Sequence, residues 1–169
     1  MNRGLSLGIV SGLAGAVALA ATAQGLLEGG AKAPEESTEI AGLSVLGEPV
    51  TQGTVEQGSK IYVESCAACH GAKLEGQPDW RRRAEDGRMP APPHDESGHT
   101  WHHADRDLFT IIKHGVGAVV PGYESDMPAF EGVLSDDEIK AVLAYIKTSW
   151  SERARSYQAE ISAKSGDQP

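Results

Sequence analysis

Three stretches of the chain repeat apolar residues at steps of three and four, the spacing of one face of an α-helix. The second stretch ends just before Gly115, a residue typical of the position past a helix end. The third follows Ser135, with Glu138 three residues on, which is the spacing of a capping box. No stretch alternates apolar and polar residues as a half-buried strand does, so the pattern predicts an all-α domain. The three stripes are Gly58, Ile61, Tyr62, Cys66 and Cys69; Leu108, Ile111 and Ile112; and Ile139, Val142, Leu143, Ile146 and Trp150.

The N-terminal segment has a different pattern. After Arg3 the chain carries no charge up to Leu27, and Ala21-Thr22-Ala23 offers the small residues at which signal peptides are cut. These features predict a secretory signal peptide over residues 1–23. An uncleaved anchor over residues 5–27 is the alternative, since this run is long enough to span a bilayer. In either case we expect the remainder to be periplasmic, soluble after cleavage or anchored to the inner membrane.

Composition divides the rest of the chain into three parts. Residues 24–54 are rich in Gly, Pro, Glu, Ser and Thr, which indicates a flexible linker. Residues 151–169 form a polar C-terminal tail. The domain is therefore expected at residues 55–150, where the core is small enough that a buried prosthetic group would supply much of its centre.

Residues 66–70 read Cys-Ala-Ala-Cys-His, the spacing by which a c-type haem is attached. This motif predicts one covalent haem c, with thioethers at Cys66 and Cys69 and with His70 as the proximal ligand of the iron. A structural zinc site needs four ligands, and the chain has only 2 cysteines. A thioredoxin-like dithiol requires a βαβ context that the flanks do not offer. A disulfide would not require the adjacent histidine.

On the pentad and the helices around it, residues 55–150 resemble a monohaem class I cytochrome c. The resemblance implies helices wrapped around one haem, the first ending in the pentad and crossing the last. It also implies a glycine packed against an aromatic ring at the crossing, here Gly58 against Tyr145, with Tyr62 beside them. Residues 71–105 depart from the family, because they are richer in Arg, Pro and His than a minimal member.

The resemblance implies a methionine as the distal iron ligand, in a loop before the last helix. Met127 lies there, in Asp-Met-Pro-Ala-Phe, and the following proline keeps the backbone extended. Met89 also precedes a proline and is the alternative.

The resemblance further implies a proline carbonyl that accepts a hydrogen bond from Nδ1 of His70, which would set the tautomer of that ring. Pro92, Pro93 and Pro78 are the candidates, and the sequence does not choose between them.

A cluster of histidines surrounds Trp101 in His-Thr-Trp-His-His at residues 99–103, and His94 precedes it. The resemblance implies that Trp101 and one imidazole contact the haem propionates. A copper or zinc site, a distal histidine ligand, and a solvated loop that only caps the following helix are the alternatives.

The formal net charge of −9 argues against binding to nucleic acid or to anionic lipid and favours partners with basic patches. With His70 and Met127 both binding the iron, as the resemblance implies, and no acid–base or nucleophile arrangement in the sequence, we predict an electron carrier, not an enzyme. Its iron would cycle between Fe(II) and Fe(III) and exchange single electrons with redox proteins. A cytochrome subunit of a larger periplasmic or membrane-bound dehydrogenase or oxidase is the first alternative. The second is a ligand-binding or peroxidatic haem protein, which would require Met127 to be absent or labile.

Overall fold

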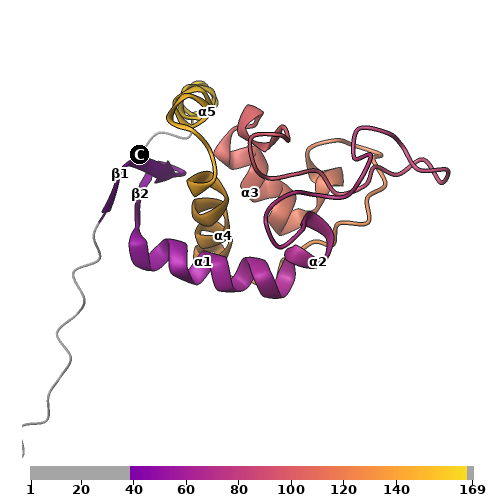
Figure 1. Ribbon diagram of the computed structural model, residues 1–169, viewed down its shortest axis with the longest axis horizontal. Coiled ribbons are helices and arrows are strands. Elements are labelled where there is room, and N and C mark those ends of the chain that lie inside the picture. Colours follow the sequence, from indigo (N-terminus) through magenta and orange to yellow (C-terminus); the bar gives the residue numbers. More distant parts are fainter. Residues whose placement is uncertain (1–38, 167–169) are drawn as a thin grey trace, which may run out of the picture. The chain divides into compact units, whose positions relative to one another are not determined.

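The computed structural model describes residues 39–166. A short antiparallel hairpin precedes a set of helices (Figure 1). The strands are β1 (Glu39–Val45) and β2 (Glu48–Thr51), and the helices are α1 (Gln52–Ser65), α2 (Ala67–His70), α3 (Asp105–His114), α4 (Asp136–Thr148) and α5 (Glu152–Lys164), with short 3-10 turns η1 (Thr100–His102) and η2 (Val116–Ala118). None of these helices is both long and apolar enough to cross a membrane. The expected signal peptide or anchor lies outside the described residues.

The three helices expected from the apolar period are confirmed as α1, α3 and α4. Each turns most of the predicted stripe toward one shared core, although Ile111 of α3 is only half-buried and Cys69 is exposed. Gly115 ends α3 with φ of 84°, a left-handed conformation that favours glycine. Trp150 lies just past the end of α4 and is buried. The sequence stripes therefore predict the helical core correctly.

Helix α1 crosses α4 at Gly58 (Figure 1). A Cβ atom on Gly58 would lie 1.9 Å from the carbonyl oxygen of Ala141, so only glycine lets the two backbones approach this closely. The three atoms nearest a Cβ on Gly58 belong to Ala141 and Val142, and the expected contact between Gly58 and Tyr145 stays a prediction. Tyr145 packs against Tyr62, with ring centroids 5.3 Å apart.

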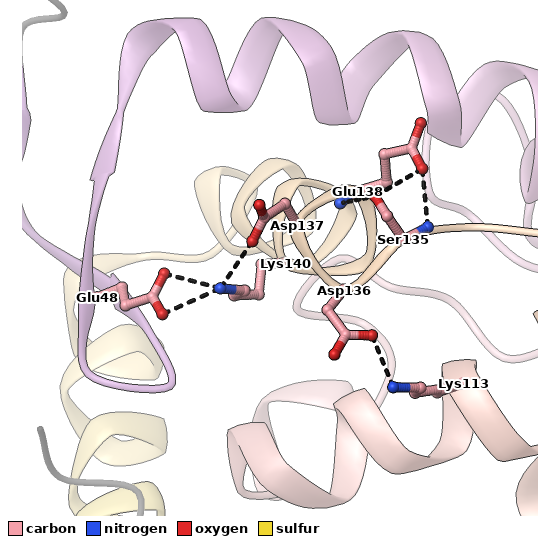
Figure 2. A network of polar contacts seen from close by, with 7 residues as sticks. All are labelled: Glu48, Lys113, Ser135, Asp136, Asp137, Glu138 and Lys140. Atoms are coloured by element: carbon pink, nitrogen blue, oxygen red, sulfur yellow. Dashed lines mark hydrogen bonds and ion pairs between the residues drawn. The ribbon is translucent and has the colours of Figure 1, made fainter. Parts of the chain in front are cut away.

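The capping box at the start of α4 is confirmed (Figure 2). The Ser135 hydroxyl accepts a hydrogen bond from the Glu138 backbone N–H at 3.3 Å, and the Glu138 carboxylate accepts one from the Ser135 N–H at 2.8 Å. These two bonds satisfy two backbone donors that a helix N-terminus otherwise leaves unpaired. The bonds that the Glu138 carboxylate accepts from the Ser135 N–H and hydroxyl lower its pKa.

Ion pairs extend from the same turn to two neighbouring elements (Figure 2). Asp136 pairs with Lys113 of α3 at 2.7 Å. Lys140 pairs with Asp137 at 2.9 Å and with Glu48 of β2 at 2.9 Å. The carboxylates are exposed to solvent, so each pair contributes no more than about 1 kcal/mol.

The hairpin lies in a segment that composition assigned to a flexible linker, so the all-α prediction is wrong at this point. Its turn consists of Leu46 and Gly47, with φ of 51° and 80°, the positive values of a type I′ hairpin turn. Leu43, Val45 and Val50 are buried in the core. Residues 24–54 as a whole are rich in Gly, Pro, Glu, Ser and Thr, which hides the apolar residues of the hairpin that carry the packing.

Helix α5 likewise occupies most of the expected polar tail. Its cap is Ser151, whose hydroxyl accepts from the Ala154 N–H at 3.3 Å. The buried face consists of Ala154, Gln158 and Ser162, a stripe too polar for an apolar period to reveal. Ser162 Oγ in turn accepts a hydrogen bond from the Asp105 N–H at 3.0 Å and so caps α3.

A buried ion pair joins the hairpin to the helices. Lys147 of α4 lies 2.6 Å from Asp105 of α3, and their side chains are only 4% and 3% exposed. Asp105 also accepts hydrogen bonds from the Leu46 N–H at 2.9 Å and the Gln158 amide at 2.7 Å. Lys147 donates to the Ser44 carbonyl at 2.7 Å. The two charges therefore hold β1, α3, α4 and α5 together at one point.

Candidate haem-binding site

The pentad begins at Cys66, the residue that follows α1, and its other four residues form α2. Cys66 interrupts the helix with φ of −120°, and its carbonyl accepts a hydrogen bond from the His70 N–H at 2.9 Å. Both thiols are free; Cys66 is partly buried against the core, whereas Cys69 is exposed. Burial raises the pKa of the Cys66 thiol to about 11. The motif thus places the protonated Cys66 thiol, the exposed Cys69 thiol and the His70 imidazole within about one helical turn.

The His70 side chain points inward, and the residue is only 7% exposed. Its Nδ1 lies 2.9 Å from the carbonyl oxygen of Pro92, so Nδ1 carries the hydrogen and donates it. Burial lowers the pKa of His70, which keeps the imidazole neutral. Nε2 is then the unprotonated nitrogen, the form in which histidine binds a metal. The structure thereby selects Pro92 from the three candidate prolines.

Two glycines that the sequence analysis did not identify hold Pro92 and Pro93 in place. A Cβ atom on Gly76 would lie 2.4 Å from Pro93 N, and one on Gly98 would lie 2.0 Å from Pro93 O. Gly76 also has φ of 70°, and its N–H donates to the His70 carbonyl at 2.8 Å. Glycine at both positions lets three backbone segments meet beside His70. These two glycines are recognised only in the structure, by their shared contact with Pro93.

Met127 lies in the loop before α4 and packs, partly buried, against the core. The loop is held by a hydrogen bond from the Met127 N–H to Ser125 Oγ at 3.1 Å and by one from the Phe130 N–H to the Ile112 carbonyl at 3.0 Å. Met89 is also partly buried, but it does not belong to the residues that pack against the core. These contacts favour Met127 as the distal ligand, and the assignment stays a prediction.

Trp101 has an indole N–H that is buried and has no hydrogen-bond partner within the described residues. Its ring contacts His102, with centroids 3.7 Å apart, and Tyr157 of α5 at 5.6 Å. A buried donor without an acceptor is costly, so its partner is expected to be a group that the polypeptide does not supply. A haem propionate is an acceptor of this kind.

The remaining histidines do not form a metal site. Residues 39–166 contain no group of three or more His, Cys, Asp or Glu side chains placed to hold an ion. His99 stacks on Trp80 with ring centroids 5.4 Å apart, and its edge contacts the His103 ring at 5.3 Å. Burial is the main cause that lowers the pKa of both His99 and His103. The alternative that these histidines cap α3 gains no support, because the Asp105 N–H at the start of that helix donates to Ser162 Oγ.

A c-type haem therefore fits the residues present. Two free thiols at the attachment spacing lie beside an imidazole whose Nε2 is unprotonated. A buried indole donor lacks an acceptor. A methionine packs against the core from a separate loop.

Comparison with known proteins agrees with this site. The sequence model of the family described as cytochrome C oxidase, cbb3-type, subunit III matches residues 53–146. The chain is 32% identical over 104 residues to the Cbb3-type cytochrome c oxidase subunit FixP of Bradyrhizobium sp. (strain ORS 278), which covers 61% of this chain and 30% of the relative. It is 32% identical over 104 residues to the subunit CcoP of Azospirillum sp. (strain B510), covering 62% and 31%.

The CcoP subunit of Rhodobacter capsulatus is 26% identical over 104 residues, covering 62% of this chain and 32% of the relative. The chain thus matches about a third of the length of these curated relatives. No solved structure matches it significantly. The family match covers more than half of the chain and includes the pentad, the first helix and most of α4. The resemblance is thereby confirmed: the chain belongs to the cbb3-type cytochrome c oxidase subunit III family and contains a class I cytochrome c domain.

Proposed function

We propose that this chain carries single electrons in the periplasm through a haem c attached to Cys66 and Cys69. The observation that carries the proposal is the buried His70, whose Nδ1 donates to Pro92 O and whose Nε2 is left unprotonated beside two free thiols. When bound, the haem supplies an iron that exchanges one electron between its ferrous and ferric states.

The residues of the chain hold that iron in six-coordinate form on this proposal. His70 would be the proximal ligand and Met127 the distal one, and Trp101 would donate a hydrogen bond to a propionate. A thioether ligand raises the reduction potential relative to a second histidine. With His70 and Met127 both bound, the iron would have no open position for a substrate, so the domain would act as a carrier and not as a catalyst.

The relatives favour a second, more specific role. Each of the three is named as a subunit of a Cbb3-type cytochrome c oxidase. The alternative is therefore that this chain is the cytochrome subunit of a larger oxidase or dehydrogenase complex, permanently bound to its partners. Co-purification with other subunits from native membranes supports this role, whereas recovery of the chain alone from the periplasmic fraction supports a free carrier.

Attachment is tested with the cysteine variants. Cys66→Ala and Cys69→Ala each remove one thioether sulfur, so covalent haem should fall sharply in both. The measurement is haem retained on the polypeptide after denaturation and extraction with acidic organic solvent. Release of the haem from the wild-type protein under these conditions contradicts the proposal.

The distal ligand is tested by comparing two methionine variants. Met127→Ala should open the sixth position, lower the midpoint potential and admit carbon monoxide, because the iron loses its thioether ligand. Met89→Ala is the matched control and should leave the coordination unchanged. The opposite result would assign the ligand to the Met89 loop.

The carrier role is tested with the wild-type protein. Electron exchange with a basic redox partner should be fast and should slow as salt screens the acidic surface. Rapid, saturable reduction of hydrogen peroxide by fully six-coordinate protein would identify a peroxidatic enzyme instead.

A further inference from the structure

His94 differs from the other histidines of its segment because it stacks on His70. The two ring centroids lie 4.0 Å apart, and the planes are inclined by only 21°. None of the other described histidines has a ring contact with His70. The His94 ring therefore covers one face of the imidazole assigned to the iron.

His94 is itself held from several directions. Its Nδ1 lies 2.9 Å from Thr100 Oγ1, and its backbone N–H donates to the Leu74 carbonyl at 2.8 Å. Its carbonyl accepts a hydrogen bond from the Trp150 indole at 2.8 Å. The edge of the Tyr62 ring approaches at 6.2 Å between centroids. These contacts leave the His94 ring little freedom to move.

The Thr100 hydroxyl links His94 to the same proline segment. Thr100 Oγ1 is hydrogen-bonded to His94 Nδ1 at 2.9 Å and lies 3.4 Å from the Pro93 carbonyl oxygen. Pro92 accepts from His70 and Pro93 from Thr100, so adjacent carbonyls of one segment orient both stacked rings.

A ring at this position restrains a motion that the Pro92 bond leaves free. The torsion that turns an imidazole about its Cβ–Cγ bond has broad minima, and a carbonyl accepts hydrogen bonds over a wide range of directions. An aromatic ring 4.0 Å away blocks tilting toward that side. An aliphatic side chain would fill the same space and would need no hydrogen-bond partner, so filling space does not by itself require a histidine here.

We propose that His94 is a positioning residue that sets the plane of the His70 ring that would bind the haem iron. This inference rests on the proposed function, since it takes His70 as the proximal ligand. The plane of an axial imidazole decides which iron d orbitals its π system overlaps, so it affects the magnetic anisotropy and the reduction potential. His94 acts through His70 and does not touch the iron.

The test compares haem-loaded variants. His94→Phe keeps a flat ring in the stack, whereas His94→Leu removes the ring at similar volume. His114→Leu is the matched control, because His114 is exposed and pairs only weakly with Glu131 at 3.4 Å. The readouts are the electron paramagnetic resonance g values of the ferric protein, the spread of its haem methyl proton shifts, and the midpoint potential.

We expect His94→Leu to change the g values, the methyl shifts and the potential, and His94→Phe and His114→Leu to keep the wild-type pattern. Wild-type values in His94→Leu, or equal changes in the Phe and Leu variants, would overturn the proposal. If His94→Leu does not fold, His94→Met decides, because it also removes the flat ring from the stack on His70. An altered methyl pattern then supports the proposal and an unaltered one overturns it.

The haem content of the wild-type protein separates this inference from the proposed function. If no covalent haem is attached, the proposed function fails before His94 is tested. If haem is attached with His70 as its ligand and His94→Leu is unchanged, only the positioning role fails.

Discussion

Gly58→Ala tests the close approach of the α1 and α4 backbones where the two helices cross. The added Cβ would lie 1.9 Å from the Ala141 carbonyl oxygen and 2.4 Å from its carbonyl carbon. These atoms belong to the backbone of a helix and cannot rotate away. Because real Cβ atoms essentially never approach a neighbour closer than 3.0 Å, the two helices must separate by about 1 Å.

The energetic effect has two parts of opposite sign. Overpacking of a well-packed contact costs about 1–3 kcal/mol, and a clash with backbone belongs at the upper end. Replacing glycine by alanine inside a helix returns about 1 kcal/mol. We therefore expect Gly58→Ala to lower the free energy of unfolding by about 2 kcal/mol.

Gly53→Ala is the matched control, since it makes the same change in the same helix. A Cβ at residue 53 meets only Thr51 Oγ1, at 3.8 Å, which is an ordinary contact. This variant should be unchanged or more stable by up to about 1 kcal/mol. Guanidinium denaturation of the haem-loaded proteins measures both, with a constant m-value as the check that the unfolded states are comparable. Equal stability of Gly58→Ala and wild type would refute the close approach of the two backbones.

Two further predictions concern buried and titrating groups. Lys147→Met should cost about 3–5 kcal/mol, because it leaves the Asp105 carboxylate buried without its cation. Lys140→Met, which breaks more exposed pairs, should cost less than about 1 kcal/mol in the same denaturation assay; equal losses would contradict the reasoning. Burial lowers the pKa of His99 and His103 from 6.5, so the unfolded chain binds more protons than the folded one below that value. Their contribution to the free energy of unfolding should therefore be fully present above pH 6.5. It should fall as the pH drops from 6.5 toward the folded pKa values. Urea denaturation between about pH 7.5 and about pH 5 measures this slope, which should be shallower with glutamine at both positions; an unchanged slope in that variant would assign the effect elsewhere.

The sequence by itself predicts the parts of this protein that depend on neighbours along the chain. The pentad is readable because Cys66, Cys69 and His70 must follow one another within a turn to reach one haem. The three helical stripes and the Ser135 capping box are readable for the same reason, since a helix brings residues three and four apart onto one face. The family follows from these local patterns, and the comparison confirms it.

The tertiary structure alone decides contacts between residues far apart in the chain. The choice of Pro92 over Pro78 and Pro93 depends on a bond to His70, 22 residues away. The hairpin and α5 were missed because their few buried residues are stabilised by other elements, as when Ser162 caps α3 across 57 residues. The stacking of His94 on His70 has no signal in sequence spacing. Such contacts form only once the core has folded, because only packing brings these groups within bonding distance.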